Sequence, residues 1–118
     1  MNLDDALKAH GDWKVKLRTA IRDRQQIDAA TLARDNACPF GQWLHGGAKT
    51  QYGKLKSYAN CLDKHAAFHR EAGKVAAAIN AGRFAEAEKM LDGGTPYAFA
   101  SSAVGGAILG LRKEAAIA

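Results

Sequence analysis

The chain has 118 residues, of which 47% are hydrophobic, 25% charged and 8% aromatic. This length and composition predict one globular domain over residues 1–118 and argue against a disordered chain. The sequence contains no apolar run long enough for a transmembrane helix, about 18 residues, and residues 1–5 lack a signal-peptide pattern. We therefore expect a cytoplasmic protein with no membrane partner and with reduced cysteines.

Lys and Arg number 17 and Asp and Glu number 12, which gives a net charge of +5. The basic residues are densest between Lys8 and Arg24. Most of them lie off the apolar stripe described below, so a solvated helix face explains them. Nucleic acid is not the partner we expect, because neither interleaved aromatic residues nor a known binding motif accompanies the charge.

The first predicted element is a helix over residues 3–24. Asn2 is a favoured N-cap residue, and two aspartates follow where the helix dipole favours acids. Spacings of three and four residues predict one apolar stripe, formed by Leu3, Leu7, His10, Trp13, Leu17 and Ile21. A histidine, His10, therefore lies on the buried side of this helix.

The region over residues 25–52 has a less regular pattern. Asp28 can cap a short helix that runs to about residue 34. A second short helix is predicted over Pro39–His45, since proline is favoured at the first position of a helix and glycine just past its end. Cys38 then lies at the start of this helix.

A long helix that ends at Gly82 gives the clearest signal. Its apolar positions alternate steps of three and four, which is typical of bundle helices packed at shallow angles: Leu55, Tyr58, Leu62, His65, His69, Ala72, Ala76 and Ile79. A short helix over 84–91 follows. Thr95 and Pro96 then begin a last helix, whose small residues allow close approach of another helix. The expected fold is all-α, a four-helix bundle with a short extra helix that carries Cys38.

Four side chains that can bind a metal lie on the apolar stripes of the predicted helices or at the start of the short helix: His10, Cys38, His65 and His69. His65 and His69 are one helical turn apart, so both can reach one ion. Imidazoles without partners are costly in a bundle core. A single buried histidine is more often a hydrogen-bonded core residue, but one thiolate with three imidazoles is a tetrahedral donor set that suits Zn²⁺.

Three motifs contain these residues in order: His10-Gly11-Asp12-Trp13-Lys14, Cys38-Pro39-Phe40-Gly41-Gln42-Trp43-Leu44 and His65-Ala66-Ala67-Phe68-His69. With them the chain resembles the chemoreceptor zinc-binding domain family. The resemblance implies a helical bundle that binds Zn²⁺ through His10, Cys38, His65 and His69. It also implies a homodimer and a signalling partner, a chemoreceptor or a diguanylate cyclase pathway, in the same chain or in another. The chain would be a free-standing module or a piece of a larger protein.

Neighbouring residues have simpler expected roles. Trp13 and Trp43 wall the site or fill the core, and Gly41 permits close packing of the short helix. Asp12 or Asp35 is a candidate hydrogen-bond acceptor for a ligand imidazole. We expect Cys61 to be a small packing residue, with an alternative ligand or resolving thiol as the other interpretation. We expect His45 to be exposed to solvent or to interact with the C-terminal dipole of the short helix, and not to be a ligand.

Four protein ligands leave a tetrahedral ion no open position, so we expect no enzyme. Either zinc occupancy is the signal, or an oxidant such as hypochlorous acid converts the Cys38 thiolate to a sulfenic acid. The alternative is a basic helical module that binds nucleic acid or dimerises around a purely structural metal. A di-iron bundle is disfavoured because the glutamates do not form Glu-x-x-His motifs.

Overall fold

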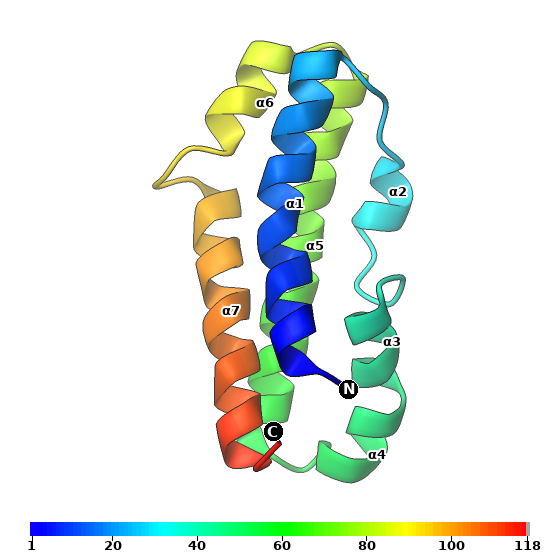
Figure 1. The fold of residues 1–118 in the computed structure, drawn as a ribbon, viewed down its shortest axis with the longest axis vertical. Helices are drawn as coiled ribbons and strands as arrows, with labels where there is room; N and C mark the ends of the chain where they lie inside the picture. Colours follow the sequence, from blue (N-terminus) through cyan, green and yellow to red (C-terminus); the bar gives the residue numbers. More distant parts are fainter. Residues whose placement is uncertain (118) are drawn as a thin grey trace.

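The computed structural model describes residues 1–117, and within this range every regular element is a helix (Figure 1). The all-α prediction is therefore confirmed. The helices are α1 (Leu3–Asp23), α2 (Ala29–Leu32), α3 (Pro39–His45), α4 (Gly47–Tyr52), α5 (Lys56–Asn80), α6 (Phe84–Met90) and α7 (Pro96–Glu114). None of them is long and apolar enough to span a membrane.

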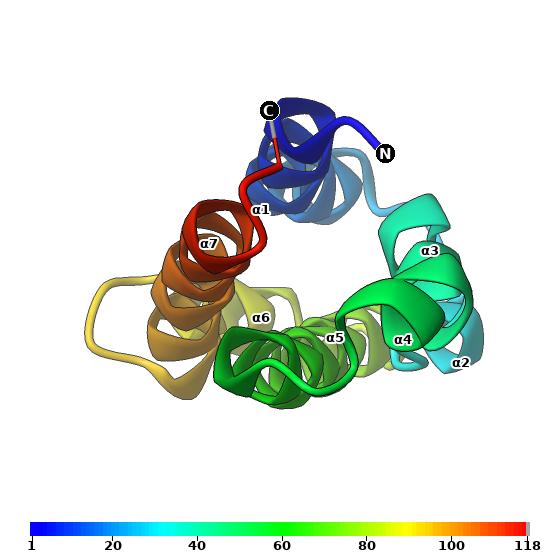
Figure 2. The same cartoon turned by 90° about the horizontal axis from the view of Figure 1, so that it is seen from below.

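The bundle has four sides, but only three of them are continuous long helices. α1, α5 and α7 form these three, and the short helices α2, α3 and α4 follow one another along the fourth (Figures 1 and 2). Successive sides run in opposite directions, as in an up-down-up-down bundle. The helix that carries Cys38 was expected as an extra element, but it is part of the fourth side, which is a broken column of short helices, and Cys38 lies at the break between α2 and α3.

Local capping signals explain where α1, α2 and α7 start. The side chain of Asn2 accepts a hydrogen bond from the Asp5 amide at 3.1 Å, and that of Asp28 accepts one from the Thr31 amide at 3.1 Å. Thr95 caps α7 in the same way. These caps satisfy amide groups that a helix start otherwise leaves unpaired, and all three were predicted from the sequence.

The sequence did not predict α4. Its N-cap residue is Gly46, which makes no side-chain capping bond, and the segment has too few residues for a periodic pattern. Tertiary contacts hold it instead: Ala48 is fully buried, and the nearby Tyr58 hydroxyl donates a 2.7 Å hydrogen bond to the carbonyl oxygen of Leu44.

The central element is α5, which packs against α7, α2, α6, α1 and α4. Its buried surface is therefore wider than the predicted stripe. Phe68 and Val75 lie off that stripe and are fully buried, whereas Leu62 on the stripe is half-buried. Gly73 lets the chain just after α2 approach closely, because a Cβ there would lie 2.6 Å from the Cβ of Ala33.

Side-chain hydrogen bonds fix the start of the α2–α4 column at one end of the bundle and the start of α5 at the other. The side chain of Asn80, at the end of α5, donates to the carbonyl of Ile27 at 2.6 Å and accepts from its amide at 2.9 Å. At the opposite end, Glu114 of α7 accepts a hydrogen bond from the Ser57 amide at 3.0 Å. This contact serves the start of α5, which has no capping side chain of its own.

Candidate metal centre

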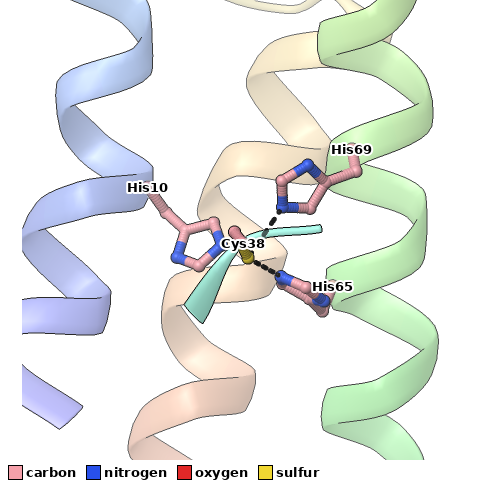
Figure 3. Close-up of side chains that lie close together, drawn as sticks. All are labelled: His10, Cys38, His65 and His69. Carbon is pink, nitrogen blue, oxygen red and sulfur yellow. Dashed lines mark hydrogen bonds between the residues drawn. The ribbon is translucent and has the colours of Figure 1, made fainter. Parts of the chain in front are cut away.

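The four candidate ligands come together in the interior of the bundle. His10 is on α1, His65 and His69 are on α5, and Cys38 is the N-cap residue of α3. One ligand atom from each residue lies within 4.8 Å of the others. Figure 3 shows the three imidazoles turned toward the Cys38 sulfur.

The histidines are more deeply buried than the cysteine. His65, His69 and His10 are 0%, 2% and 5% exposed, whereas Cys38 is half-buried. Positions 65 and 69 share one face of α5 because they are one turn apart. The four residues come from three separate segments of the chain, which are α1, the start of α3, and α5.

Two sulfur–nitrogen distances in the cluster are close to those of a tetrahedral zinc site. The Cys38 Sγ lies 3.4 Å from the Nε2 of His65 and 3.6 Å from the Nε2 of His69. A tetrahedral ion with Zn–S near 2.3 Å and Zn–N near 2.05 Å separates sulfur and nitrogen by about 3.6 Å. The donor set, one sulfur and three imidazole nitrogens, is also one that zinc prefers.

Backbone carbonyl groups orient two of the imidazoles. The Nδ1 of His10 lies 2.7 Å from the carbonyl oxygen of Ala6, and the Nδ1 of His69 lies 2.8 Å from that of Leu32. A carbonyl oxygen only accepts, so Nδ1 carries the proton in both rings. Each Nε2 then has a free lone pair directed into the cluster, as a metal ligand requires.

His65 is held by packing and by the contact of its Nε2 with Cys38. Its Nδ1 is buried and, among the described residues, has no backbone acceptor or other hydrogen-bond partner. Its ring lies edge-on to those of His69, His10 and Phe40, with centroid distances of 4.5, 4.9 and 5.1 Å. Gly41 leaves room for it, since a Cβ there would lie 3.1 Å from the His65 Cε1 and 1.8 Å from the Asp35 carbonyl oxygen.

Burial keeps the histidines neutral. It lowers the pKa of His65 to about 3, with a further lowering from the neighbouring His69, and it lowers the pKa of His10 and of His69. Neutral imidazoles are the metal-binding form. At neutral pH the three nitrogens therefore need not release protons before they bind an ion.

The cysteine needs to lose a proton. Burial raises the pKa of the Cys38 thiol, and hydrogen bonds from backbone amides of α3 partly offset this effect. The Gly41 amide donates to Cys38 Sγ at 3.3 Å. A helix start and a metal cation both favour the thiolate, so binding of zinc would supply the missing stabilisation.

The two tryptophans that were expected to wall the site or fill the core lie at different depths from the cluster. Trp13 is half-buried beside the cluster, and Lys16 Nζ lies 4.8 Å from the centroid of its ring. Trp43 packs one layer further out, against Phe40 and Tyr52, with centroid distances of 5.8 and 6.3 Å.

The expectation that an aspartate orients a ligand imidazole is wrong for the residues named. Asp12 forms an ion pair with Lys8, and Asp35 forms a 2.9 Å hydrogen bond with the Nε2 of His45. The acceptors are backbone carbonyl oxygens, which any residue type supplies and which no sequence signal identifies. His45 is exposed, as predicted.

Cys61 is fully buried, and burial raises the pKa of its thiol to about 12. This agrees with the predicted packing role. Two residues that sequence reasoning missed are Phe40 and Phe68, whose rings lie 5.6 and 5.3 Å from that of His10. Their positions beside Cys38 and His69 in the motifs were the available signal.

The model of the chemoreceptor zinc-binding domain family matches residues 10–76. The match spans more than half of the chain and contains all four clustered residues, so the chain belongs to this family. Zinc is the cofactor that the family binds, and the cluster of three histidines and one cysteine suits this ion. Searches of curated proteins and of solved structures found no match.

Acidification should destabilise the metal-free protein. In the unfolded chain an imidazole gains its proton near pH 6.5, whereas in the folded protein His65 does so only near pH 3. Between these values the unfolded state binds more protons, so the free energy of unfolding falls as the pH is lowered. Each such group contributes a slope of up to about 1.4 kcal/mol per pH unit.

Urea unfolding of chelator-treated protein at pH 7, 6 and 5 measures this slope. The His45→Gln variant is the control and should keep it, because His45 is exposed and lies outside the cluster. The His65→Leu variant should lose part of the slope. A free energy of unfolding that does not change between pH 7 and pH 5 would contradict the buried, neutral histidines.

Proposed function

We propose that this chain is a sensory module that binds one Zn²⁺ through His10, Cys38, His65 and His69. The observation that carries the proposal is the match between the two sulfur–nitrogen distances, 3.4 and 3.6 Å, and a tetrahedral ion. Four protein ligands would leave no position for a water or substrate, so the role is regulatory and not catalytic.

The ion would connect parts of the bundle that otherwise have few contacts. α1 packs against α7, α5 and α6, and its direct contacts with α2 and α3 are few. His10 and Cys38 lie on opposite sides of this weak seam (Figure 3). Gain or loss of zinc would therefore change how firmly the segment around Cys38 is attached to α1.

Two inputs can act on this connection. The first is the zinc concentration itself. The second is an oxidant such as hypochlorous acid, which would convert the Cys38 thiolate to a sulfenic acid and remove the anionic ligand. The output would be a chemotaxis or cyclic-di-GMP signalling partner in the cytoplasm, in the same chain or in another.

The purified protein should contain about one zinc per chain by elemental analysis, because four donors suit a single ion. The Cys38→Ala and His69→Ala variants should bind zinc much more weakly. The loss should exceed the roughly 10–100-fold loss typical when only an outer hydrogen-bond partner is removed.

Cys61→Ala and His45→Ala are the matched controls, since each removes the same residue type outside the cluster. Both should keep their zinc. The ligand assignment would be wrong if protein refolded with excess zinc held none, or if the controls lost as much zinc as the ligand variants.

We also propose that two copies of the chain associate through the outer face of α7. No charged residue occurs between Pro96 and Leu111, although the chain has a net charge of +5. Phe99 and Leu109 on this helix are 67% and 46% exposed. A second copy would present the same uncharged face, so the pair could approach there without like-charge repulsion.

Light scattering of the wild-type protein should then give the mass of a dimer. Adding two carboxylates to the face with Phe99→Glu and Leu109→Glu should give a monomer that still binds zinc, because the change places like charges in the interface. Val15→Glu on α1, where Val15 is 66% exposed, is the control and should remain dimeric. A monomeric wild-type protein would contradict the interface.

A further inference from the structure

Two cavities meet at the cysteine of the candidate metal centre. The first, of about 290 Å³, lies between the start of α1 and the start of α3, and His10, Cys38 and Phe40 line it. The second, of about 400 Å³, lies between α1 and the α2 region, and Cys38, Leu32 and His69 line it. Ala9, Trp13, Cys38 and Pro39 line both cavities, and we call the two together the Cys38 groove.

The Cys38 groove follows from the way the bundle is packed. α1 is packed against α5, α6 and α7, while the column of short helices is packed against α5. The seam between α1 and that column is therefore incompletely filled. His65 and His69 are almost fully buried from the other sides, so the open approach to the cluster is along this seam.

The walls of the groove are mainly apolar. The apolar lining includes the rings of Trp13, Pro39 and Phe40 and the side chains of Ile27 and Leu32. Three charged residues also line the groove: Asp5, Lys16 and Asp28. Ala9 is exposed, which agrees with an open floor on the α1 side. Volumes of this size match small molecules, and apolar walls favour uncharged ones because a buried charge without a partner is costly.

We propose that the Cys38 groove binds small, uncharged molecules that carry a soft electrophilic carbon, such as quinones and α,β-unsaturated carbonyl compounds, and presents them to Cys38 Sγ. This inference rests on the proposed function, because it makes modification of a zinc ligand the regulatory event. It differs from occupancy of the site by zinc and from oxidation of the sulfur.

The reaction is a conjugate addition and needs no oxidant or reductant. A lone pair of Cys38 Sγ forms a bond to the β-carbon of the acceptor, and the carbon–carbon π electrons move toward the carbonyl oxygen. In metal-free protein the thiol proton goes to solvent, and a proton from solvent adds to the α-carbon. In zinc-loaded protein the sulfur would already be a thiolate, so one proton is taken up from solvent and none is released. The product is a thioether, which carries no negative charge and is a poor zinc ligand compared with a thiolate.

Loss of the anionic donor would weaken the link between α1 and the segment that holds Cys38. Cys38 is half-buried and lines both cavities, so an acceptor in the groove can reach its sulfur. Cys61 would not compete, because it is fully buried and lines neither cavity.

The test compares two maleimides of the same reactive group, uncharged N-ethylmaleimide and an analogue with a sulfonate. Their rates of addition to Cys38 are measured by intact mass on the zinc-loaded Cys61→Ala protein, with glutathione as the free-thiol reference. For each thiol, the rate with N-ethylmaleimide is divided by the rate with the sulfonated analogue. This ratio should be at least about tenfold larger for Cys38 than for glutathione, since burial of the sulfonate in a mainly apolar groove is costly. Zinc release, followed with a chromogenic chelator, should keep pace with the addition.

A variant pair locates the effect in the groove. Ala9→Trp places a large ring in the groove and should slow the addition of N-ethylmaleimide by at least about fivefold. Val15→Trp introduces the same ring on an exposed part of α1 outside both cavities and should not slow it. Ala9 is exposed, so its substitution does not overpack the core.

The inference is overturned if the rate ratio equals that of glutathione, or if the two tryptophan variants react at the same rate. Zinc content of the same samples separates this outcome from failure of the proposed function. Protein that holds zinc but shows no selectivity contradicts the groove alone, whereas protein without zinc contradicts the metal site.

Discussion

The structure depends on the burial of three neutral imidazoles next to one thiol at the centre of the bundle. Such groups are costly in an apolar interior unless they have partners. Backbone carbonyls satisfy the Nδ1 atoms of His10 and His69, and the Nε2 atoms of His65 and His69 lie within 3.6 Å of the Cys38 sulfur. A zinc ion shared by these donors would offset the remaining cost, and folding and metal binding would then be coupled at this point.

The position of this cluster makes it suitable for regulation. Two of its members belong to α5, the best-packed helix, while His10 and Cys38 come from elements whose backbones make few direct contacts with each other. A change at the cluster therefore acts mainly on the seam between α1 and the broken column of short helices. The same seam contains the two cavities through which small molecules can reach the cysteine.

The long helices, their caps and the four clustered residues could be predicted from the sequence, because helical periodicity and capping residues are local signals. The helix α4 could not, since a buried Ala48 and not a local motif holds it in place. The acceptors of the ligand imidazoles were also missed, because the carbonyl oxygens of Ala6 and Leu32 belong to the backbone. The broken fourth side and the cavities arise from tertiary packing, which a single sequence does not encode locally.

X-ray absorption at the zinc edge of the loaded protein tests the central claim most directly. The four-ligand site predicts one sulfur at about 2.3 Å and three nitrogens at about 2.0–2.1 Å from the metal. The Cys38→Ala variant should lose the sulfur signal if it retains any zinc. A wild-type spectrum without sulfur, or with additional oxygen ligands in place of imidazole nitrogen, would contradict the assignment of His10, Cys38, His65 and His69 as the complete ligand set.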